Sequence, residues 1–481
     1  MIFNSYEFIV FFTLVFILYW FVLDKTSKTQ NSLLLIASLV FFGWTDWRFL
    51  IVLIFNILFN YFLAKKIYKE NKEKIKIRIL WIGIIINVGV LGYYKYFNFF
   101  YENFVDVFHV FGSDLTFSPL QIIIPLGISF FTFQTLGYIL DVFYEEVEPY
   151  SDILLFSTYV TFFPKILSGP IERAQKFIPQ IVNKRTFNYN MAVDGLRQIL
   201  WGVFAKMVIA ENCAEIVNPI FNNYQNESGN TLLIGASFYA IQLYADFSGY
   251  SNMAIGVSKL FGIDLMRNFA TPFFSTNISD FWRKWHMSLT TWMMDYIFTP
   301  LSFTLRRFKK LGLIFSIILT FLIVGLWHGA NWTFVVFGAL HGIYFIPLVL
   351  TGSMNKSSIV AKDRFLPSLV EIIKMASLFY LITLTSIFFR SKQVSDAIEY
   401  IQIIFSKSLF SYPVAFINAN VFSVIFLIFI YFTIEWFHRT KSHDFEISNK
   451  PVYVRWTLYI GLFVFLILFG KSSDTFIYFQ F

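Results

Sequence analysis

The residues of this chain with the greatest capacity for chemistry lie inside an apolar stretch. His328 and Asn331 fall in the segment 325–332 (GLWHGANW), which interrupts an otherwise apolar run from Leu311 to Leu350. Polar side chains at membrane depth cost free energy unless they pair or line a cavity, so an ionisable residue there marks a candidate functional site. An imidazole can take up a proton near neutral pH. The segment therefore predicts proton-transfer chemistry in a place where water is scarce.

Two further histidines lie close to this segment. His286 precedes His328 and His341 follows it, so three of the six histidines fall within one stretch. A lone buried histidine is more often a core residue bonded to a helix carbonyl, and the clustering moves our interpretation toward chemistry. In one continuous helix His341 would lie about 20 Å from His328, so we do not expect both to reach one substrate atom. The spacing differs from the histidine pair of zinc hydrolases, and we predict no metal site.

The composition defines the class of protein that must hold these residues. The chain has 481 residues, of which 57% are hydrophobic and 14% charged. Repeated apolar runs of about 20 residues predict an all-α polytopic membrane protein and not a β-barrel. We expect about 11 to 13 membrane segments, including re-entrant or broken helices. No long polar linker interrupts them, so residues 1–481 are expected to form a single integral-membrane domain.

The charges and the single cysteine narrow the possible functions. The net charge is +8, but the basic residues lie in short loops between apolar runs, where they fix membrane orientation, so we expect no nucleic-acid partner. Cys213 alone cannot form a disulfide within the chain. The basic loop from Lys65 to Arg78 should be cytoplasmic, and the three spans before it place the N-terminus outside. The first span, Phe8 to Leu23, lacks the flanks of a cleaved signal peptide and should be retained.

Two segments are expected to break. Pro164, Gly169 and Pro170 interrupt the stretch from Leu154 to Gln180, which reads as a re-entrant or broken helix. Glu172 and Arg173, which follow this interruption, have two equally supported interpretations: an interfacial ion pair or a role at a substrate entrance.

The run from Leu311 to Leu350 would measure about 60 Å as one helix, twice the hydrocarbon thickness, so we expect it to turn or break. We place the break between Gly329 and Asn331. Gly325 and Gly329 should let another backbone approach closely beside His328.

A polar stripe is predicted on the helix before these segments. Gln242, Asp246 and Tyr250 repeat every four residues, so they share one helix face, which should point into the protein. Arg197 and Lys206, near the ends of an earlier span, are expected to snorkel toward the membrane surface. The stretch from about residue 280 to 300 is amphipathic and too polar for a lipid-facing span.

Acyl transfer to a hydroxyl would use these groups well. A base must remove the hydroxyl proton as the oxygen attacks, and His328 can do this. His286, Asn331 or a buried water could orient His328 or stabilise developing charge. A transporter that uses Asp246 and the histidines as a proton relay explains the polar groups equally well. No glycine-rich phosphate loop is present, which argues against an ATP-driven pump.

Several motifs together resemble one family. The segments 280–289 (DFWRKWHMSL) and 325–334 (GLWHGANWTF), with His341 and Gly342 behind them, resemble the signature of membrane-bound O-acyltransferases. The segments 125–130 (PLGISF), 168–173 (SGPIER) and 246–251 (DFSGYS) are similar to parts of its alginate O-acetyltransferase branch. The resemblance extends over nearly the whole chain.

The resemblance implies a fold and a site. It implies a ring of helices around a thin centre, with funnels from both faces that meet in a tunnel at the catalytic histidine. His328 becomes the catalytic base and His286 the second site residue. Trp285 and Trp327, each directly before one of these histidines, would support the site.

The resemblance also implies substrates and partners. The donor would be a cytoplasmic thioester, acetyl-CoA, with no bound cofactor, and Arg283, Lys284 and Arg173 are candidate contacts for its phosphates, although lipid headgroups would attract the same charges. The acceptor would be an extracytoplasmic polysaccharide such as alginate, peptidoglycan or cellulose. A separate periplasmic or surface-anchored esterase-like transferase is the expected partner, in a bacterial cytoplasmic membrane. The alternative within the family is D-alanyl transfer to teichoic acid from a carrier protein.

Overall fold

The computed structural model describes residues 1, 3–111, 122–354, 359–411 and 419–471, and these residues form helices and loops with no β-strand. The described chain divides into two compact units, which we treat separately. Unit 1 comprises Met1–Tyr189 and Ser258–Leu265, and unit 2 comprises Asn190–Val257 and Met266–Phe481. The prediction of one membrane domain over residues 1–481 stays a prediction.

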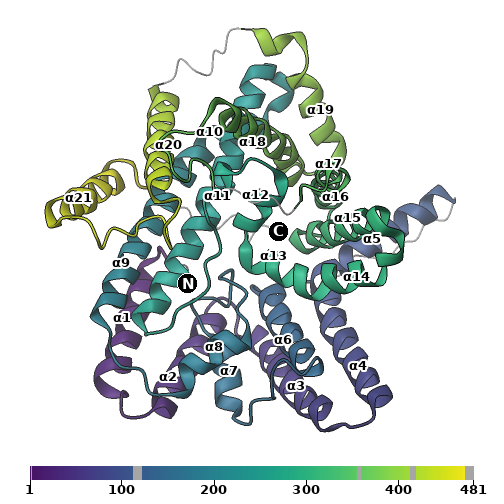
Figure 1. The fold of residues 1–481 in the computed structure, drawn as a ribbon, viewed down its shortest axis with the longest axis vertical. Helices are drawn as coiled ribbons and strands as arrows, with labels where there is room; N and C mark the ends of the chain where they lie inside the picture. Colours follow the sequence, from purple (N-terminus) through teal and green to yellow (C-terminus); the bar gives the residue numbers. More distant parts are fainter. Residues whose placement is uncertain (2, 112–121, 355–358, 412–418, 472–481) are drawn as a thin grey trace. The chain divides into compact units, whose positions relative to one another are not determined.

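Unit 1 is built from helices whose starts are set by local sequence. Ser5 caps α1, and Thr26 with Thr29 forms a capping box at the start of α2, because these side chains satisfy the unpaired N–H groups of the first turn. The helices of this unit are α1 (Tyr6–Ile17), extended by a π-helical turn over Leu18–Val22, α2 (Ser27–Gly43), α3 (Phe49–Lys69), α4 (Glu73–Leu91), a second π-helical turn over Gly92–Tyr96, α5 (Phe97–Val110), α6 (Ile128–Phe143), α7 (Ile153–Thr161) and α8 (Ala174–Val182) (Figure 1).

Buried asparagines join two helices of unit 1. On α3, Asn56 and Asn60 each donate from Nδ2 to Oδ1 of Asn87 on α4, at 2.9 and 3.0 Å, and Asn87 returns a bond of 2.8 Å to Asn60. Interhelical amide bonds of this kind stabilise membrane helices because their polar groups find no water in the bilayer. The helix α3 continues to Lys69 and α4 begins at Glu73, so the predicted basic loop from Lys65 to Arg78 is helical except at residues 70–72.

Unit 2 contains the histidine-rich segments. Its longer helices carry the polar stripe and His328, whereas the segment 280–289 lies on two short helices. They are α9 (Tyr189–Phe204), a π-helical segment over Ala205–Ala210, α10 (Glu211–Asn222), α11 (Gly229–Leu260, whose last turn is counted in unit 1), α12 (Ile278–Lys284), α13 (Met287–Met293), a π-helical turn over Met294–Phe298, α14 (Thr299–Thr304), α15 (Lys309–His328), α16 (Trp332–Tyr344), α17 (Ile346–Thr351), α18 (Leu369–Arg390), α19 (Val394–Ile404), α20 (Ala419–His438) and α21 (Val452–Phe469), with four 3₁₀ turns over Tyr224–Asn226, Pro272–Phe274, Arg306–Phe308 and Lys407–Phe410.

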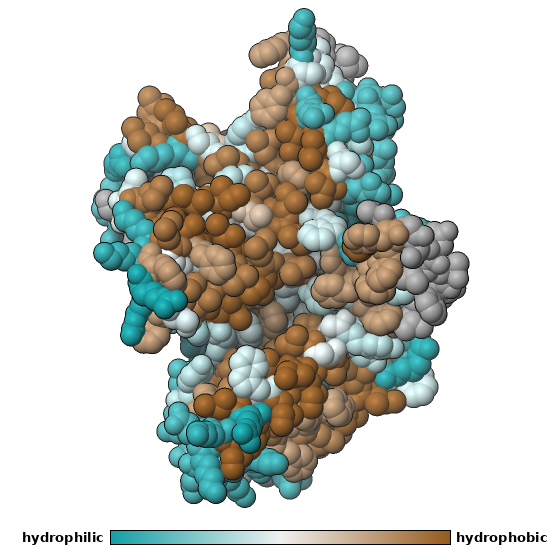
Figure 2. Space-filling view, turned by 90° about the vertical axis from the view of Figure 1, so that its right-hand side faces the viewer, coloured by the Kyte–Doolittle hydropathy of each residue, from teal (hydrophilic) through white to brown (hydrophobic). Residues whose placement is uncertain are grey.

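The helices confirm a polytopic membrane protein. Seven helical stretches of the described chain are long and apolar enough to cross a membrane, and two shorter apolar helices accompany them. Apolar side chains are exposed over large areas of the face in Figure 2, with hydrophilic residues at its edges, as expected of a surface in contact with lipid. The total of about 11 to 13 segments and the central funnel stay predictions.

Both predicted breaks are present. The stretch from Leu154 to Gln180 is divided into α7 and α8 by the turns at Phe163–Ser168, and the run from Leu311 to Leu350 is divided between His328 and Trp332. One break was not predicted: the amphipathic stretch that begins at Asp280 is interrupted at Trp285 and His286.

Candidate active site

His328 is the last residue of α15, at the turn of a helical hairpin. The next helix, α16, begins at Trp332 and is capped by Asn331, whose Oδ1 accepts from the Thr333 backbone N–H at 2.9 Å. The Asn331 Nδ2 donates to the carbonyl oxygen of Lys392 at 2.9 Å. These two hydrogen bonds of Asn331 anchor the start of α16, which defines the position of the turn after His328.

Two glycines let α15 and α16 pack backbone to backbone. A Cβ atom at Gly325 would lie 2.2 Å from the Phe334 carbonyl oxygen, and one at Gly338 would lie 2.2 Å from that of Phe321. Only glycine fits at such a distance, as in other close crossings of membrane helices. The predicted close approach is confirmed at Gly325 but is wrong for Gly329, where a Cβ atom would meet the ring of Phe334.

The hairpin surrounds His328 with aromatic rings. The imidazole is buried, and its centroid lies 5.7 Å from Phe337 on α16 and 5.0 Å from Phe389 on α18. Phe337 also contacts His341, at 4.5 Å between centroids. The separation of about 20 Å that one continuous helix would give does not apply, because α16 folds back along α15 and both imidazoles contact the same phenyl ring. That the two histidines do not reach one substrate atom stays a prediction.

His286 lies in the break between α12 and α13. Its backbone is left-handed, with φ of 43°, an uncommon conformation for a residue with a side chain, which points to local constraint. The ring is 0% exposed and lies edge to face with Phe247 of α11, at 4.7 Å. Nδ1 is 3.2 Å from Oδ1 of Asn268. Burial lowers the pKa of His286 to about 3, so its imidazole is neutral at physiological pH.

Trp327 brings the two principal histidines together. Its indole adjoins His328, with centroids 4.8 Å apart, and lies 5.6 Å from the imidazole of His286. Three site residues predicted from motifs about forty positions apart in the sequence thus form one buried cluster in unit 2.

Trp285, the residue directly before His286, lies in a layer of aromatic rings. It stacks on Phe281 with centroids 5.4 Å apart and contacts Phe269 at 5.2 Å and Tyr244 at 5.9 Å. The Tyr244 hydroxyl donates to Oε1 of Glu435 at 2.7 Å. Glu435 is a buried residue of α20 that was not predicted from the sequence. The aromatic layer thus fixes the backbone that leads into His286.

The polar stripe on α11 is buried, as predicted. Gln242, Asp246 and Tyr250 all lie in the interior. Asp246 forms an ion pair with Lys206, with Oδ1 and Nζ 2.5 Å apart, and Lys206 also reaches Glu211 at 3.2 Å. The prediction that Lys206 snorkels is therefore wrong, because a carboxylate inside the unit holds its ammonium group.

Arg197 was also expected to snorkel, and that expectation is wrong too. Its Nε donates to the Tyr459 hydroxyl at 2.7 Å and its Nη1 to Ser448 Oγ at 2.9 Å, and the residue is buried. Tertiary partners, rather than lipid headgroups, satisfy the guanidinium group.

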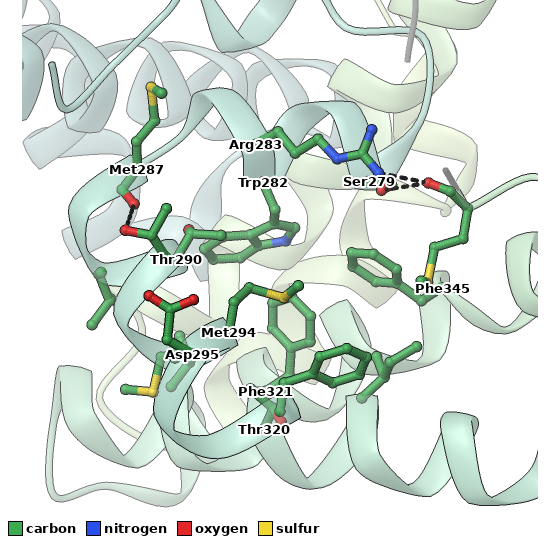
Figure 3. Close-up of a pocket in the computed structure, with 17 residues that line it drawn as sticks. Ser279, Trp282, Arg283, Met287, Thr290, Met294, Asp295, Thr320, Phe321 and Phe345 are labelled. Carbon is green, nitrogen blue, oxygen red and sulfur yellow. Dashed lines mark hydrogen bonds between the residues drawn. The ribbon is translucent and has the colours of Figure 1, made fainter. Parts of the chain in front are cut away.

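A cavity of about 350 Å³ lies beside α15 (Figure 3). Ile317, Phe321 and Val324 line it from one face of α15, and His328 lies one turn beyond Val324 on that same face. Trp282, whose indole lies among the lining residues in Figure 3, donates from Nε1 to His341 Nδ1 at 3.2 Å.

Arg283 is the cationic residue among the side chains that line this cavity. Its Nη2 donates to the Met354 carbonyl oxygen at 3.0 Å, and Asp295 adds a carboxylate to the lining. The cavity is otherwise mostly apolar. Its lining suits a largely apolar group with a polar end.

Glu172 and Arg173 belong to unit 1. Glu172 is buried, and its carbonyl oxygen accepts from the Tyr159 hydroxyl at 2.8 Å. Nearby in the broken segment, Lys165 donates to Gln134 and lies over the Tyr159 ring at 4.5 Å. Both interpretations of the Glu172 and Arg173 pair stay open.

Within the described parts of the chain, no three histidine, cysteine or acidic side chains are grouped to hold a metal ion.

Two residues beside His286 were not predicted from the sequence. Asn268 contacts His286, and Ser288 contacts the Asn268 carboxamide. Asn268 lies 18 residues before His286 in a loop with no periodicity, so no spacing rule marks it.

Comparisons with known proteins identify the family of this chain. The model of the MBOAT, membrane-bound O-acyltransferase family matches residues 142–391. A peptidoglycan O-acetyltransferase of Helicobacter pylori is 31% identical over 100% of this chain and 98% of its own length. A probable alginate O-acetylase AlgI of Pseudomonas aeruginosa is 32% identical over 84% of this chain and 75% of its own, and a teichoic acid D-alanyltransferase of Bacillus subtilis is 33% identical over 52% and 64%.

The apolar helices define a multi-pass membrane protein, and unit 2 holds a buried histidine cluster. The chain belongs to the membrane-bound O-acyltransferase family and is an acyltransferase. The alternative of a proton-coupled transporter is therefore set aside.

Proposed function

We propose that this acyltransferase moves an acetyl group from a cytoplasmic thioester to an extracytoplasmic polysaccharide. The observation that carries the proposal is the meeting of His286 and His328 at Trp327, next to a helix face that lines a cavity. The peptidoglycan O-acetyltransferase that aligns with the full chain supports acetyl as the group and a cell-envelope glycan as the acceptor.

His328 is the proposed general base. In the reaction, the acceptor hydroxyl attacks the thioester carbonyl carbon while its proton passes to the imidazole. The tetrahedral intermediate then collapses, the carbon–sulfur bond breaks, and the thiolate leaves and is protonated. The aromatic surroundings of His328 exclude water and so limit hydrolysis of the thioester.

The cavity beside α15 is proposed to receive the thioester arm of the donor. Acetyl-CoA is the donor we propose, because the mostly apolar lining would accommodate a pantetheine arm and Arg283 would meet negative charge at its end. No cofactor is proposed to stay bound. The donor cannot cross the bilayer, so the protein would sit in a bacterial cytoplasmic membrane with the basic loop inside and the N-terminus outside.

A partner completes the proposed pathway. We expect a periplasmic or surface-anchored esterase-like transferase to take up the acyl group, and we expect membrane lipids to surround the helices. Transfer of D-alanine to teichoic acid is the second candidate, supported by the similarity to the Bacillus subtilis enzyme over about half of this chain. A gene for an esterase-like transferase beside this one would favour acetylation, and a gene for a carrier protein would favour D-alanylation.

The direct test replaces His328 by Ala. We expect the O-acetyl content of envelope polysaccharide to fall by roughly 100-fold or more, because proton transfer by a positioned base contributes about that much. His109→Ala, at an exposed position of α5, is the matched control and should leave acetylation unchanged. Normal acetylation with a folded, membrane-inserted His328→Ala protein would refute the proposed base.

The donor site has its own test. Val324→Phe places a larger side chain in the cavity and so reduces the space for the donor. We expect the KM for acetyl-CoA to rise by about 10-fold in purified protein held in lipid nanodiscs. Ile343→Phe, an exposed position on α16, is the control. An unchanged KM in folded Val324→Phe protein would place the donor elsewhere.

A further inference from the structure

The side-chain carboxamide of Asn268 is enclosed by polar atoms beside His286. The residue is 0% exposed. Its Oδ1 lies 3.3 Å from the Ser288 backbone nitrogen, 2.9 Å from Ser288 Oγ and 3.2 Å from His286 Nδ1. The Asn268 carbonyl oxygen also accepts from the Met287 backbone N–H at 2.8 Å, so the side chain and the backbone of Asn268 both hold the residues that directly follow His286.

The orientation of this carboxamide is fixed by its neighbours. A backbone N–H can only donate, so the atom that faces Ser288 N must be the acceptor Oδ1. On its other side, Nδ2 donates to Ser251 Oγ on α11 at 3.1 Å. A flipped amide would set an NH₂ group against the Ser288 N–H and leave that backbone N–H buried without an acceptor, which costs free energy.

The orientation of Asn268 determines which nitrogen of His286 carries the proton. The Ser288 hydroxyl also lies 3.5 Å from Nδ1, but it donates its hydrogen to Oδ1 at the shorter distance of 2.9 Å. Oδ1 has no hydrogen, so its bond to Nδ1 at 3.2 Å requires a proton on Nδ1. A neutral imidazole has one N–H, so Nε2 then carries the lone pair. We propose that Asn268 is a positioning residue that holds His286 in the Nδ1–H tautomer, so that Nε2 enters acyl transfer as an acceptor of a proton or hydrogen bond.

The inference rests on the proposed function and narrows it. A residue that stabilises an oxyanion must donate a hydrogen bond. His286 in the Nδ1–H tautomer cannot donate from Nε2, and the lowered pKa of the ring keeps the doubly protonated form out of the physiological range. His286 is therefore assigned to accept from the acceptor hydroxyl or from the imidazole of His328, and the oxyanion must be stabilised by other groups.

A second histidine provides an internal reference. Trp282 Nε1 can only donate, and it lies 3.2 Å from His341 Nδ1, so His341 carries its proton on Nε2. Both residues are buried in unit 2, and the two tautomers should therefore appear side by side in one spectrum.

The test is nitrogen NMR on full-length protein with ¹⁵N-labelled histidine in lipid nanodiscs. The signals of His286 and His341 are assigned by their loss in His286→Gln and His341→Gln proteins. We expect Nδ1 of His286 and Nε2 of His341 to have the shifts of protonated nitrogens. An Nε2–H tautomer at His286 in the unaltered protein would overturn the inference whatever the activity data show.

Variants of Asn268 test its part in this arrangement. Asn268→Leu, of similar size but without an acceptor, should release the tautomer preference and lower acetylation by roughly 100-fold. Asn268→Asp keeps an acceptor and should keep Nδ1 protonated. Ser251→Ala removes the other partner of the carboxamide and should leave the tautomer unchanged.

The outcomes separate this inference from the proposed function. A folded Asn268→Leu protein that keeps the Nδ1–H tautomer would overturn the role of Asn268, and if this protein does not fold, loss of the Nδ1–H form in Asn268→Asp would do so. Acetylation that persists in His286→Ala, with the Nδ1–H tautomer found in the unaltered protein, would remove His286 from the proposed function and leave the tautomer assignment standing.

Discussion

The hairpin of α15 and α16 and the break between α12 and α13 each hold a buried histidine in a different way. In the hairpin, His341 lies in a regular helix and accepts a hydrogen bond from Trp282. In the break, His286 has a left-handed backbone and faces the acceptor Asn268. Burial is equal in the two regions, so burial alone does not indicate function. The identity of the partner determines which imidazole nitrogen carries the lone pair and where it points.

The largest effect is expected from a variant that disrupts the packing of α15 against α16 in the hairpin. Gly338→Val would drive side-chain atoms into the Phe321 carbonyl oxygen, where a Cβ atom already has only 2.2 Å. We expect acetylation to fall to background and Tm to drop, because α15 and α16 must separate and His328 moves with them. Gly89→Ala on α4, where a Cβ atom meets nothing within 4 Å, should keep activity and hold or raise Tm. Thermal melting and acetyl content measured together check both, and a fully active Gly338→Val protein would contradict the close packing.

The next largest effect is a loss of stability on disruption of the buried ion pair of α11, the helix that packs against His286. Phe247 of α11 contacts His286, and its neighbour Asp246 pairs with the buried Lys206. Asp246→Leu leaves that ammonium group without its closest carboxylate and should lower the free energy of unfolding by about 3 kcal/mol. The double variant Asp246→Leu with Lys206→Met should recover much of this loss. Melting curves of the single and double variants in the same detergent decide the point, and equal stability would show that the pair contributes little.

A comparison of the two histidines themselves comes third. His286→Ala should lower acetylation by roughly 100-fold, whereas His341→Phe should retain most activity because its neighbours Phe337, Phe321 and Trp282 already form an aromatic layer. The measurement is acetyl content at matched protein levels in the membrane. Equal losses in the two variants would show that the two regions do not differ in the way proposed.

The smallest effect separates capping from chemistry at the hairpin turn. Asn331→Ala removes the cap of α16 and should cost about 1 kcal/mol of stability, while Asn331→Asp retains the acceptor for the Thr333 N–H and should cost less. Acetylation per folded molecule should be nearly unchanged in both. A large loss of activity at normal Tm would instead assign Asn331 a direct part in the reaction.

Much of the fold was predictable because bilayer physics restricts the chain so strongly. Runs such as Val452 to Phe469 are helices in the structure because no other conformation satisfies their backbone in lipid. The break after His328 followed from length alone, since the run was twice the thickness of the hydrocarbon. The end of α11 was not predictable in this way, because polar residues from Gln242 to Asn252 look like a span end and are instead buried in a helix that continues to Leu260.

The site was predictable only in part. His286, Trp327 and His328 were singled out by motif, and the structure brings their rings together. The fate of Lys206 was missed because its partner Asp246 lies 40 residues away, and a rule based on span ends cannot see that contact. Asn268 was missed for the same reason, with no repeat or charge to mark it.

The sequence by itself determined that this chain is a polytopic helical membrane protein of the O-acyltransferase family, because hydrophobic length and motif order are local properties of the chain. Only the tertiary structure decided that α16 folds back to bring His341 to the same phenyl ring as His328, and that Asn268 faces His286. Hydrogen-bond direction depends on which atoms meet across loops and helices, and residues distant in the sequence supply those atoms.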